Sequence, residues 1–161
     1  MMSSPRVLGE MAGLGFRATE LGAPGFLPAE PGDVKSELGN YDMSLLGAFT
    51  PVVIHDSAHR AEAIAGAKDA ARFLQSAGAS KFISCPVLDM DWSIPRALSS
   101  SEVTHMAEMF AIIDDICGEH GLEQVLHPHV QTLVETKDDI SRVLDTCDVH
   151  FCLDTGHMAF G

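Results

Sequence analysis

Short apolar runs alternate along this chain with longer segments in which apolar residues recur every three or four positions. The short runs are typical of buried β-strands, and the longer segments are typical of amphipathic helices. The predicted strands cover residues 16–22, 44–55, 81–89, 123–130 and 149–154. The predicted helices cover residues 4–15, 56–79, 99–121 and 136–147.

The order of these elements predicts an α/β fold with a parallel sheet. Strands alternate with helices, and no Asn-Gly or Asp-Gly hairpin turn joins two strands. Two architectures fit this order: a doubly wound open sheet, or part of a (β/α)8 barrel. A complete barrel takes about 250 residues. If these 161 residues, with about five strands, belong to a barrel, its first strand and its last two strands are missing.

Composition and charge narrow the class of protein. With 46% hydrophobic and 20% charged residues, the chain is typical of a globular domain. A net charge of −13 argues against nucleic acid as a partner, because phosphate binding needs clustered Lys and Arg. No stretch approaches the roughly 18 to 20 apolar residues that a membrane span needs. Four cysteines without CxxC spacing, Cys85, Cys117, Cys147 and Cys152, predict buried thiols in a cytoplasmic protein.

Polar residues follow the predicted strands at their carboxyl ends, where sites are built in parallel α/β folds. They are Glu20, His55 with Asp56, Asp89 with Asp91, His127 with His129, and Asp154 with His157. Mixed imidazole and carboxylate groups suit Mn, Co, Zn or Fe, so the pattern predicts a divalent-metal site. Each of these residues also has an ordinary structural interpretation, since an Asp after a strand commonly caps the next helix.

The segment "LDTGH" carries the most specific signal. Asp154 would close a strand and point its carboxylate at the barrel axis, and the turn at Thr155 and Gly156 would bring His157 back to the same cavity. The alternative is an Asp that caps a helix and a His that faces solvent.

Three stretches resemble a known family. "FCLDTGHMAFG" is similar to the sixth-strand motif of the xylose-isomerase-like TIM-barrel superfamily of sugar isomerases and epimerases. "LHPHVQTLVET" and "RVLGEMAGLGFRATELGAPGFLP" resemble its myo-inosose-2 dehydratase branch. The resemblance implies a single incomplete TIM-barrel domain over residues 1–161, cut from a longer enzyme. It also implies that Asp154 binds the metal and that His157 binds metal or substrate.

The sequence departs from the family pattern at two places. His127 stands where the superfamily has a fifth-strand Glu ligand, so either His127 or Glu135 is the expected metal ligand there. Gln131 replaces a Gly of the HPHxGT segment, which is expected to alter the loop.

The resemblance implies a metal-dependent lyase that dehydrates an inosose, a cyclic keto-polyol, in inositol catabolism. A divalent ion, Mn or Co before Zn, would be the cofactor. His157 and His129 are expected to transfer protons or to contact substrate hydroxyls, and Glu20 would orient the substrate. A sugar epimerase or isomerase is the alternative within the fold, and a non-catalytic remnant is the alternative outside enzymes. The expected partner is a small sugar-like substrate rather than a nucleic acid or a membrane, and a homo-oligomer is allowed.

Overall fold

The computed structural model of the chain describes residues 2–160. Five strands form one sheet in the order β1-β2-β3-β4-β5, and every neighbouring pair is parallel. The strands are β1 (Ala18–Glu20), β2 (Ser44–Val52), β3 (Lys81–Pro86), β4 (Glu123–Leu126) and β5 (His150–Phe151). Within residues 2–160 the sheet is unclosed, and β1 and β5 are its edges.

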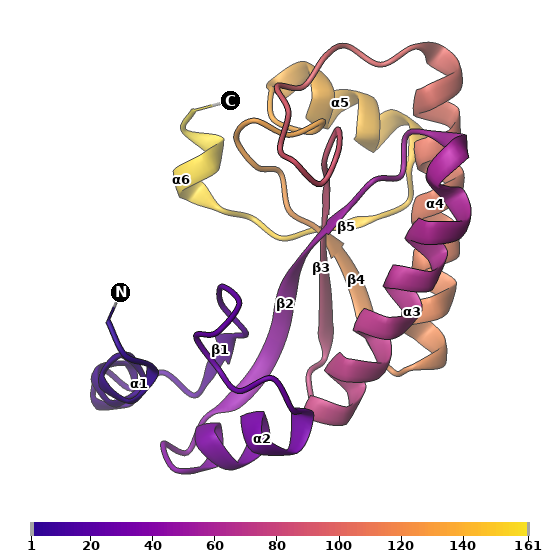
Figure 1. The fold of residues 1–161 in the computed structure, drawn as a ribbon. Coiled ribbons are helices and arrows are strands. Elements are labelled where there is room, and N and C mark those ends of the chain that lie inside the picture. Colours follow the sequence, from indigo (N-terminus) through magenta and orange to yellow (C-terminus); the bar gives the residue numbers. More distant parts are fainter. Residues whose placement is uncertain (1, 161) are drawn as a thin grey trace.

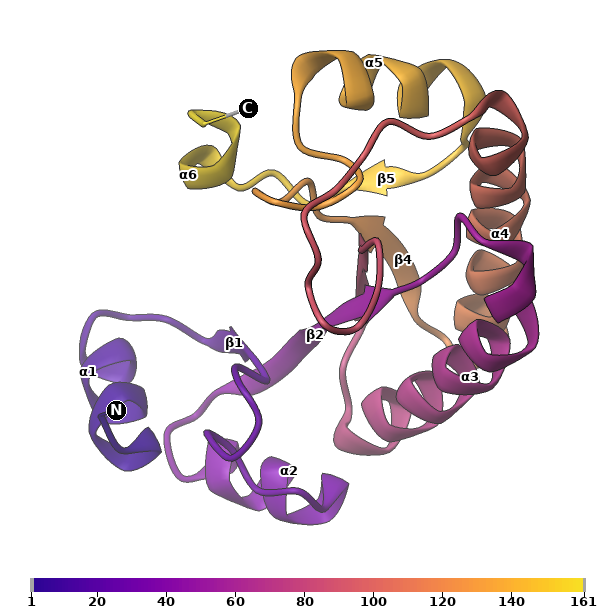
Figure 2. The same cartoon turned by 45° about the horizontal axis from the view of Figure 1, so that its top comes forward.

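Helices connect the strands in the right order for parallel crossovers. They are α1 (Ser4–Gly13), α2 (Pro31–Gly39), α3 (Arg60–Ala77), α4 (Ser100–Glu119), α5 (Lys137–Thr146) and the short α6 (Thr155–Met158), with a 3-10 turn, η1, at Ser57–His59. Helices α2 to α5 follow one another along the outer face of the curved sheet, and α6 lies on the opposite side, near the carboxyl ends (Figure 1 and Figure 2).

The main core lies between the sheet and these outer helices. Phe82 of β3 and Leu126 of β4 pack there against Leu74 of α3 and against Phe110 and Ile113 of α4. Burying a side chain of this size stabilises a fold by about 1.5–3 kcal/mol, so this interface holds the strands in place. No helix in residues 2–160 is long and apolar enough to cross a membrane.

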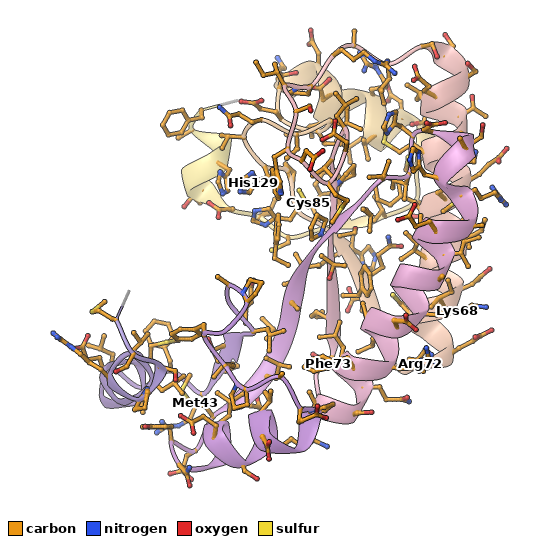
Figure 3. All side chains as sticks on the ribbon, in the orientation of Figure 1. Met43, Lys68, Arg72, Phe73, Cys85 and His129 are labelled. Atoms are coloured by element: carbon orange, nitrogen blue, oxygen red, sulfur yellow. The ribbon has the colours of Figure 1, made fainter. Side chains whose placement is uncertain are left out.

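The alternation of side chains along each strand determines what faces the concave side. Because Phe82 and Leu126 point to the helices, their neighbours Ile83, Val125 and His127 point to the opposite face. In Figure 3, His129 lies on this concave side, close to α6. The concave face therefore presents imidazole groups beside the apolar residues that line it.

The structure confirms the partial barrel of parallel strands and corrects several boundaries. The helix predicted at 56–79 divides into η1 and α3, and Asp56 caps η1 by accepting from the backbone N–H of Ala58. Every predicted strand is shorter than expected, most of all 149–154, of which only His150 and Phe151 pair. The loops after the strands are apolar too, so hydrophobicity overestimates strand length.

Helix α2 was absent from the prediction. Its sequence, "PGDVKSELG", has Gly at two positions and buries only Val34 and Leu38, so its apolar period is weak. The turn predicted at Thr155 and Gly156 is also wrong, because these residues begin α6. The four cysteines are free thiols, of which Cys85 and Cys117 are buried, as expected, whereas Cys147 and Cys152 are only half-buried.

Candidate metal and catalytic site

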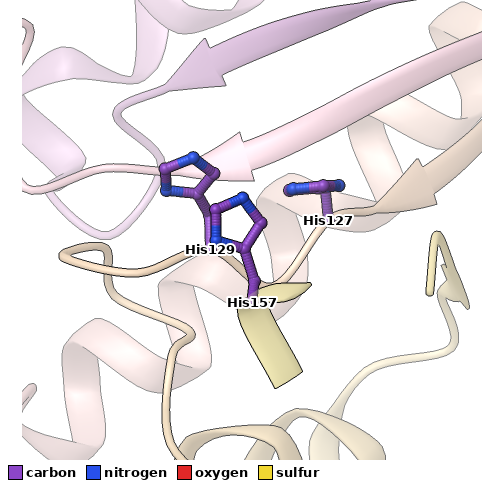
Figure 4. Close-up of side chains that lie close together, drawn as sticks. All are labelled: His127, His129 and His157. Atoms are coloured by element: carbon purple, nitrogen blue, oxygen red, sulfur yellow. The ribbon is translucent and has the colours of Figure 1, made fainter. Parts of the chain in front are cut away.

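Three histidines meet on the concave side of the sheet. His127 follows β4, His129 lies two residues further on, and His157 belongs to α6 (Figure 4). One ring nitrogen from each lies within 4.8 Å of the other two, and all three residues are half-buried. The rings of His129 and His157 are the closest pair, with centroids 4.0 Å apart. We refer to His127, His129 and His157 as the three-histidine cluster.

Backbone hydrogen bonds fix the loop that carries two of these rings. The N–H of His127 donates to the carbonyl of Ser84 at 2.9 Å, which continues the β3–β4 pairing beyond the strand end. The N–H of His129 donates to the carbonyl of Val134 at 3.1 Å, and the buried Thr132 hydroxyl donates to the carbonyl of His129 at 2.7 Å. The loop is therefore closed on itself, and the two imidazoles project from a constrained backbone.

The hydrogen bond of one ring determines its tautomer. Nδ1 of His129 lies 2.7 Å from the carbonyl oxygen of Val130. Because a carbonyl can only accept, this nitrogen must carry the proton, and Nε2 of a neutral His129 holds the free lone pair. An imidazole whose other nitrogen donates to a carbonyl is the usual form of a metal-binding histidine.

The environment of His127 favours the neutral ring. Burial lowers its pKa, and the neighbouring His129 adds to this effect, whereas Asp154 opposes it. A neutral imidazole retains the lone pair that a metal ion requires.

Asp154 caps α6. Its Oδ1 accepts from the backbone N–H groups of Gly156 at 2.7 Å and His157 at 3.0 Å, so the carboxylate sets the direction in which His157 leaves the helix. Its Oδ2 lies 3.7 Å from Nε2 of His157. The hydrogen bond from His157 and the further donor at Gly156 hold the pKa of Asp154 below its usual value. The cap foreseen as the alternative for Asp154 is present, but His157 faces the cluster rather than open solvent.

Glu20 is the acidic group at the carboxyl end of β1. Partial desolvation raises its pKa, and the negative charge of Asp154 raises it further, so the two carboxylates influence each other across the concave face. Cys152, which follows β5, has a raised pKa from burial and from the charges of Glu20 and Asp154. The carboxyl ends of the two edge strands, β1 and β5, therefore place Glu20, Cys152 and Asp154 close enough to influence one another's pKa.

Glu135 is not one of the three clustered ligands but lies beside them. Its Oε2 accepts from the backbone N–H of Gln131 at 2.9 Å. It borders a cavity of about 500 Å³ that Asp154 and His157 also line. Glu135 is thus close to the site, while the group of three mutually close metal-binding atoms consists of imidazoles.

Two aromatic residues complete the wall beside the cluster. The ring of Phe49, from β2, lies 5.7 Å from His127 and 5.5 Å from His129, measured between centroids. Trp92 stacks on Phe49 at 6.1 Å and contacts His129 at 5.9 Å. Trp92 adopts a positive φ of 59°, which is uncommon for a bulky side chain and typical of functional loops. The sequence analysis assigned neither residue a role.

Two of the polar pairs that follow predicted strands lie outside the three-histidine cluster. His55 and Asp56 line a separate cavity with residues of α4. Asp89 organises its own loop, because its Oδ1 accepts from the backbone N–H of Asp91 at 3.0 Å and from that of Ser93 at 3.1 Å. The expectation that all five strand ends supply one metal shell is therefore wrong for β2 and β3, whose acidic and imidazole groups are engaged in these other places.

The donor atoms of the three-histidine cluster fit a divalent transition metal. Imidazole nitrogens bind Zn²⁺ and related ions at about 2.0–2.1 Å, and three protein ligands with an open position are typical of catalytic zinc. The three nitrogens lie within 4.8 Å of one another, close enough for them to be candidates to hold one ion.

Comparison with known proteins identifies the family of this fold. The family model for the xylose isomerase-like TIM barrel matches residues 8–161. An inosose dehydratase of Geobacillus kaustophilus is 30% identical over 97% of this chain and 54% of its own length. The chain therefore spans about half the length of this curated relative.

Solved structures share the fold at low sequence identity. The IolI protein with a binding zinc atom has a TM-score of 0.75 and 16% identity, over 97% of this chain and 59% of that one. An L-ribulose 3-epimerase has a TM-score of 0.71 and 16% identity, over 98% of this chain and 56% of that one.

Proposed function

Because the chain belongs to the xylose isomerase-like TIM barrel family, we propose that it provides the metal-binding and proton-transfer part of an inosose dehydratase. The observation that carries the proposal is the three-histidine cluster at the carboxyl ends of the strands, beside a cavity of about 500 Å³. The inosose dehydratase of Geobacillus kaustophilus supports the choice of reaction. The substrate would be a cyclic keto-polyol.

The residues that would hold the ion differ from the set expected from sequence. That set had Asp154 with either His127 or Glu135 as ligands, and it gave His129 and His157 chiefly proton transfer or contacts with substrate hydroxyls. The mutual closeness of the imidazoles favours His127, His129 and His157 as one ligand group. Asp154 would then act chiefly by orienting His157, and Glu135 by holding the loop at Gln131.

A divalent ion at this position would polarise the substrate carbonyl and make the adjacent C–H bond more acidic. Dehydration removes a proton beside the carbonyl and a hydroxyl from the next carbon, so it needs a base and an acid. Glu20 is the candidate for both roles: its carboxylate would take the proton, and the resulting carboxyl would return that proton to the departing hydroxyl, which leaves as water. Desolvation, with the charge of Asp154, raises the pKa of Glu20 and so makes its carboxylate a stronger base than an ordinary one. Phe49 and Trp92 would exclude water from one side of the substrate.

The sugar epimerase or isomerase alternative uses the same groups. Both reactions begin by removing a proton next to a carbonyl, and they differ in whether a hydroxyl is then expelled. The fold shared with an L-ribulose 3-epimerase is compatible with this alternative. We keep dehydration first because the curated relative at 30% identity is an inosose dehydratase.

Mass spectrometry of the product separates the two reactions. The purified chain, loaded with Mn²⁺, Co²⁺ or Zn²⁺, is incubated with an inosose. We expect a product that has lost one water, whereas an epimerase or isomerase would return an isomer of unchanged mass. Glu20→Gln should lower the rate by about 10²–10⁴-fold, as loss of a proton-transfer group does. Glu37→Gln, in α2, is the matched control, and formation of neither product would contradict the proposal.

A further inference from the structure

The loop between β3 and α4, residues 87–99, brings Trp92 beside the three-histidine cluster. The centroid of the indole lies 5.9 Å from that of His129 and 6.1 Å from that of Phe49. The side chain is 43% exposed, so part of the ring is open to solvent and accessible to a ligand. The position of this indole therefore bears on how a substrate meets the cluster.

Backbone hydrogen bonds fix the base of this loop to the neighbouring chain segments. The N–H of Val87 donates to the carbonyl of Val52 at 3.0 Å, which continues the β2–β3 pairing. The carbonyl of Pro86 accepts from the N–H of Leu133 at 3.0 Å. Because Trp92 lies well beyond this base, its position depends on further interactions.

The backbone of Trp92 is in an unfavourable conformation. Its φ of 59° is rare for a bulky side chain, and such a residue persists only where the surrounding structure holds it. The contacts with Phe49 and His129 restrain the ring. The backbone conformation needs a support of its own.

Asp89 supplies this support from both sides of Trp92. Its Oδ1 accepts from the backbone N–H of Asp91 at 3.0 Å and from that of Ser93 at 3.1 Å. Its carbonyl oxygen accepts from the N–H of Trp92 itself at 3.3 Å. Hydrogen bonds from Ser93 hold the pKa of Asp89 below its usual value, so these donors favour the charged carboxylate. Three consecutive backbone N–H groups therefore converge on one residue.

We propose that Asp89 is a positioning residue of the site, which holds the turn over residues 89–93 and so presents Trp92 beside the three-histidine cluster. The inference rests on the proposed function, in which Trp92 excludes water from one side of the substrate. Asp89 acts through Trp92 and does not touch the reacting atoms. This role replaces the place in a metal shell that the sequence pattern predicted for Asp89.

Intrinsic fluorescence tests the positioning without metal or substrate, because Trp92 is the single tryptophan of the chain. Asp89→Ala removes the acceptor, so the emission should shift to longer wavelength and acrylamide should quench it more strongly. Asp89→Asn retains an acceptor oxygen and should behave like the unchanged chain. Asp91→Ala is the matched control, because it removes a neighbouring carboxylate and keeps the backbone N–H. Equal quenching of Asp89→Ala and the unchanged chain would overturn the proposal.

A second variant guards against loss of folding. Asp89→Glu keeps the charge and moves the acceptor by one methylene group, so it should also expose Trp92 to acrylamide. Far-UV circular dichroism identifies any variant that has unfolded, and Asp89→Glu then decides the question if Asp89→Ala is among them. Quenching of Asp89→Glu at the level of the unchanged chain would contradict the proposal in that case.

Steady-state kinetics with an inosose and the Mn²⁺-loaded chain connect this position to substrate binding. Asp89→Ala should raise KM by about 10-fold, as the loss of two hydrogen bonds permits, and should change kcat far less. Asp89→Asn should restore KM, and a fall in kcat at unchanged KM would contradict the role of Asp89. Absence of turnover in the unchanged chain would refute the proposed function instead, and the quenching of Trp92 would still show whether Asp89 holds it.

Discussion

The loop that carries His129 depends on an unusual backbone at one residue. Gln131 has a positive φ of 59°, a conformation that costs most residues about 1 kcal/mol or more and that Gly adopts freely. Its N–H still donates to Glu135, so the loop keeps the glycine-like conformation with a different side chain. Gln131, which stands where the resemblance expects a Gly, therefore adopts a conformation that Gly would adopt more easily.

Substituting this residue tests the conformational cost. Gln131→Gly should raise the free energy of unfolding by about 1 kcal/mol, because Gly removes the strain at positive φ. Gln131→Ala is the matched control, since it removes the same side chain and retains the Cβ. Urea unfolding measures both, and equal stability of the Gly and Ala variants would argue against strain at this position.

Residue types and their positions predicted the candidate site only in part. His127, His129 and His157 were recognisable because polar residues stand out after apolar strands. Their convergence on one cavity was expected as well. Which of their atoms lie closest was not predictable, since it depends on the capped turn at Asp154 and on the closed loop around Thr132. Phe49 escaped prediction because an aromatic residue in an apolar run usually belongs to a core, and Trp92 because a loop residue gives no signal of what it packs against.

At the scale of elements, helix ends were easier to predict than strand ends. The run "SSSE" before α4 forms a capping box, in which Ser99 and Glu102 exchange hydrogen bonds as the sequence signal indicates. Strand ends have no such signal, because the loops after β3 and β4 remain apolar. Helix α2 was not predicted, because its two glycines and few buried residues obscure the helical period.

The capping box makes stability depend on pH. The Arg96 guanidinium, helped by the Ser99 donors, holds the pKa of Glu102 well below the ordinary value of 4.5. The unfolded state therefore binds a proton first as the pH falls, so the stabilisation is complete above pH 4.5 and is lost below it.

The corresponding variant should show less acid sensitivity. Glu102→Gln should be less stable than the unchanged chain at neutral pH, and its free energy of unfolding should fall less between about pH 4.5 and pH 2. Glu119→Gln, at the other end of α4, controls for loss of one acidic charge. Urea unfolding at several pH values provides the comparison, and identical pH slopes for Glu102→Gln and the unchanged chain would refute the assignment.

At the scale of the whole molecule, the alternation of elements was sufficient to predict the parallel order β1 to β5. The alternation of elements could not show how strongly the sheet curves. The curvature determines which strand ends face one another across the concave side. Glu20 and Asp154 lie at opposite edges of the sheet, yet the charge of Asp154 raises the pKa of Glu20. Such relations across the concave face come from packing against the outer helices, which local sequence does not encode.

The most direct test of the account is the position of a bound ion. Anomalous diffraction at the zinc edge, from crystals of the Zn²⁺-loaded chain, should show a strong peak about 2.0–2.1 Å from nitrogens of His127, His129 and His157. A peak bonded to Asp154 and Glu135 without those imidazoles, or no peak on the concave face, would contradict the three-histidine cluster as the metal centre.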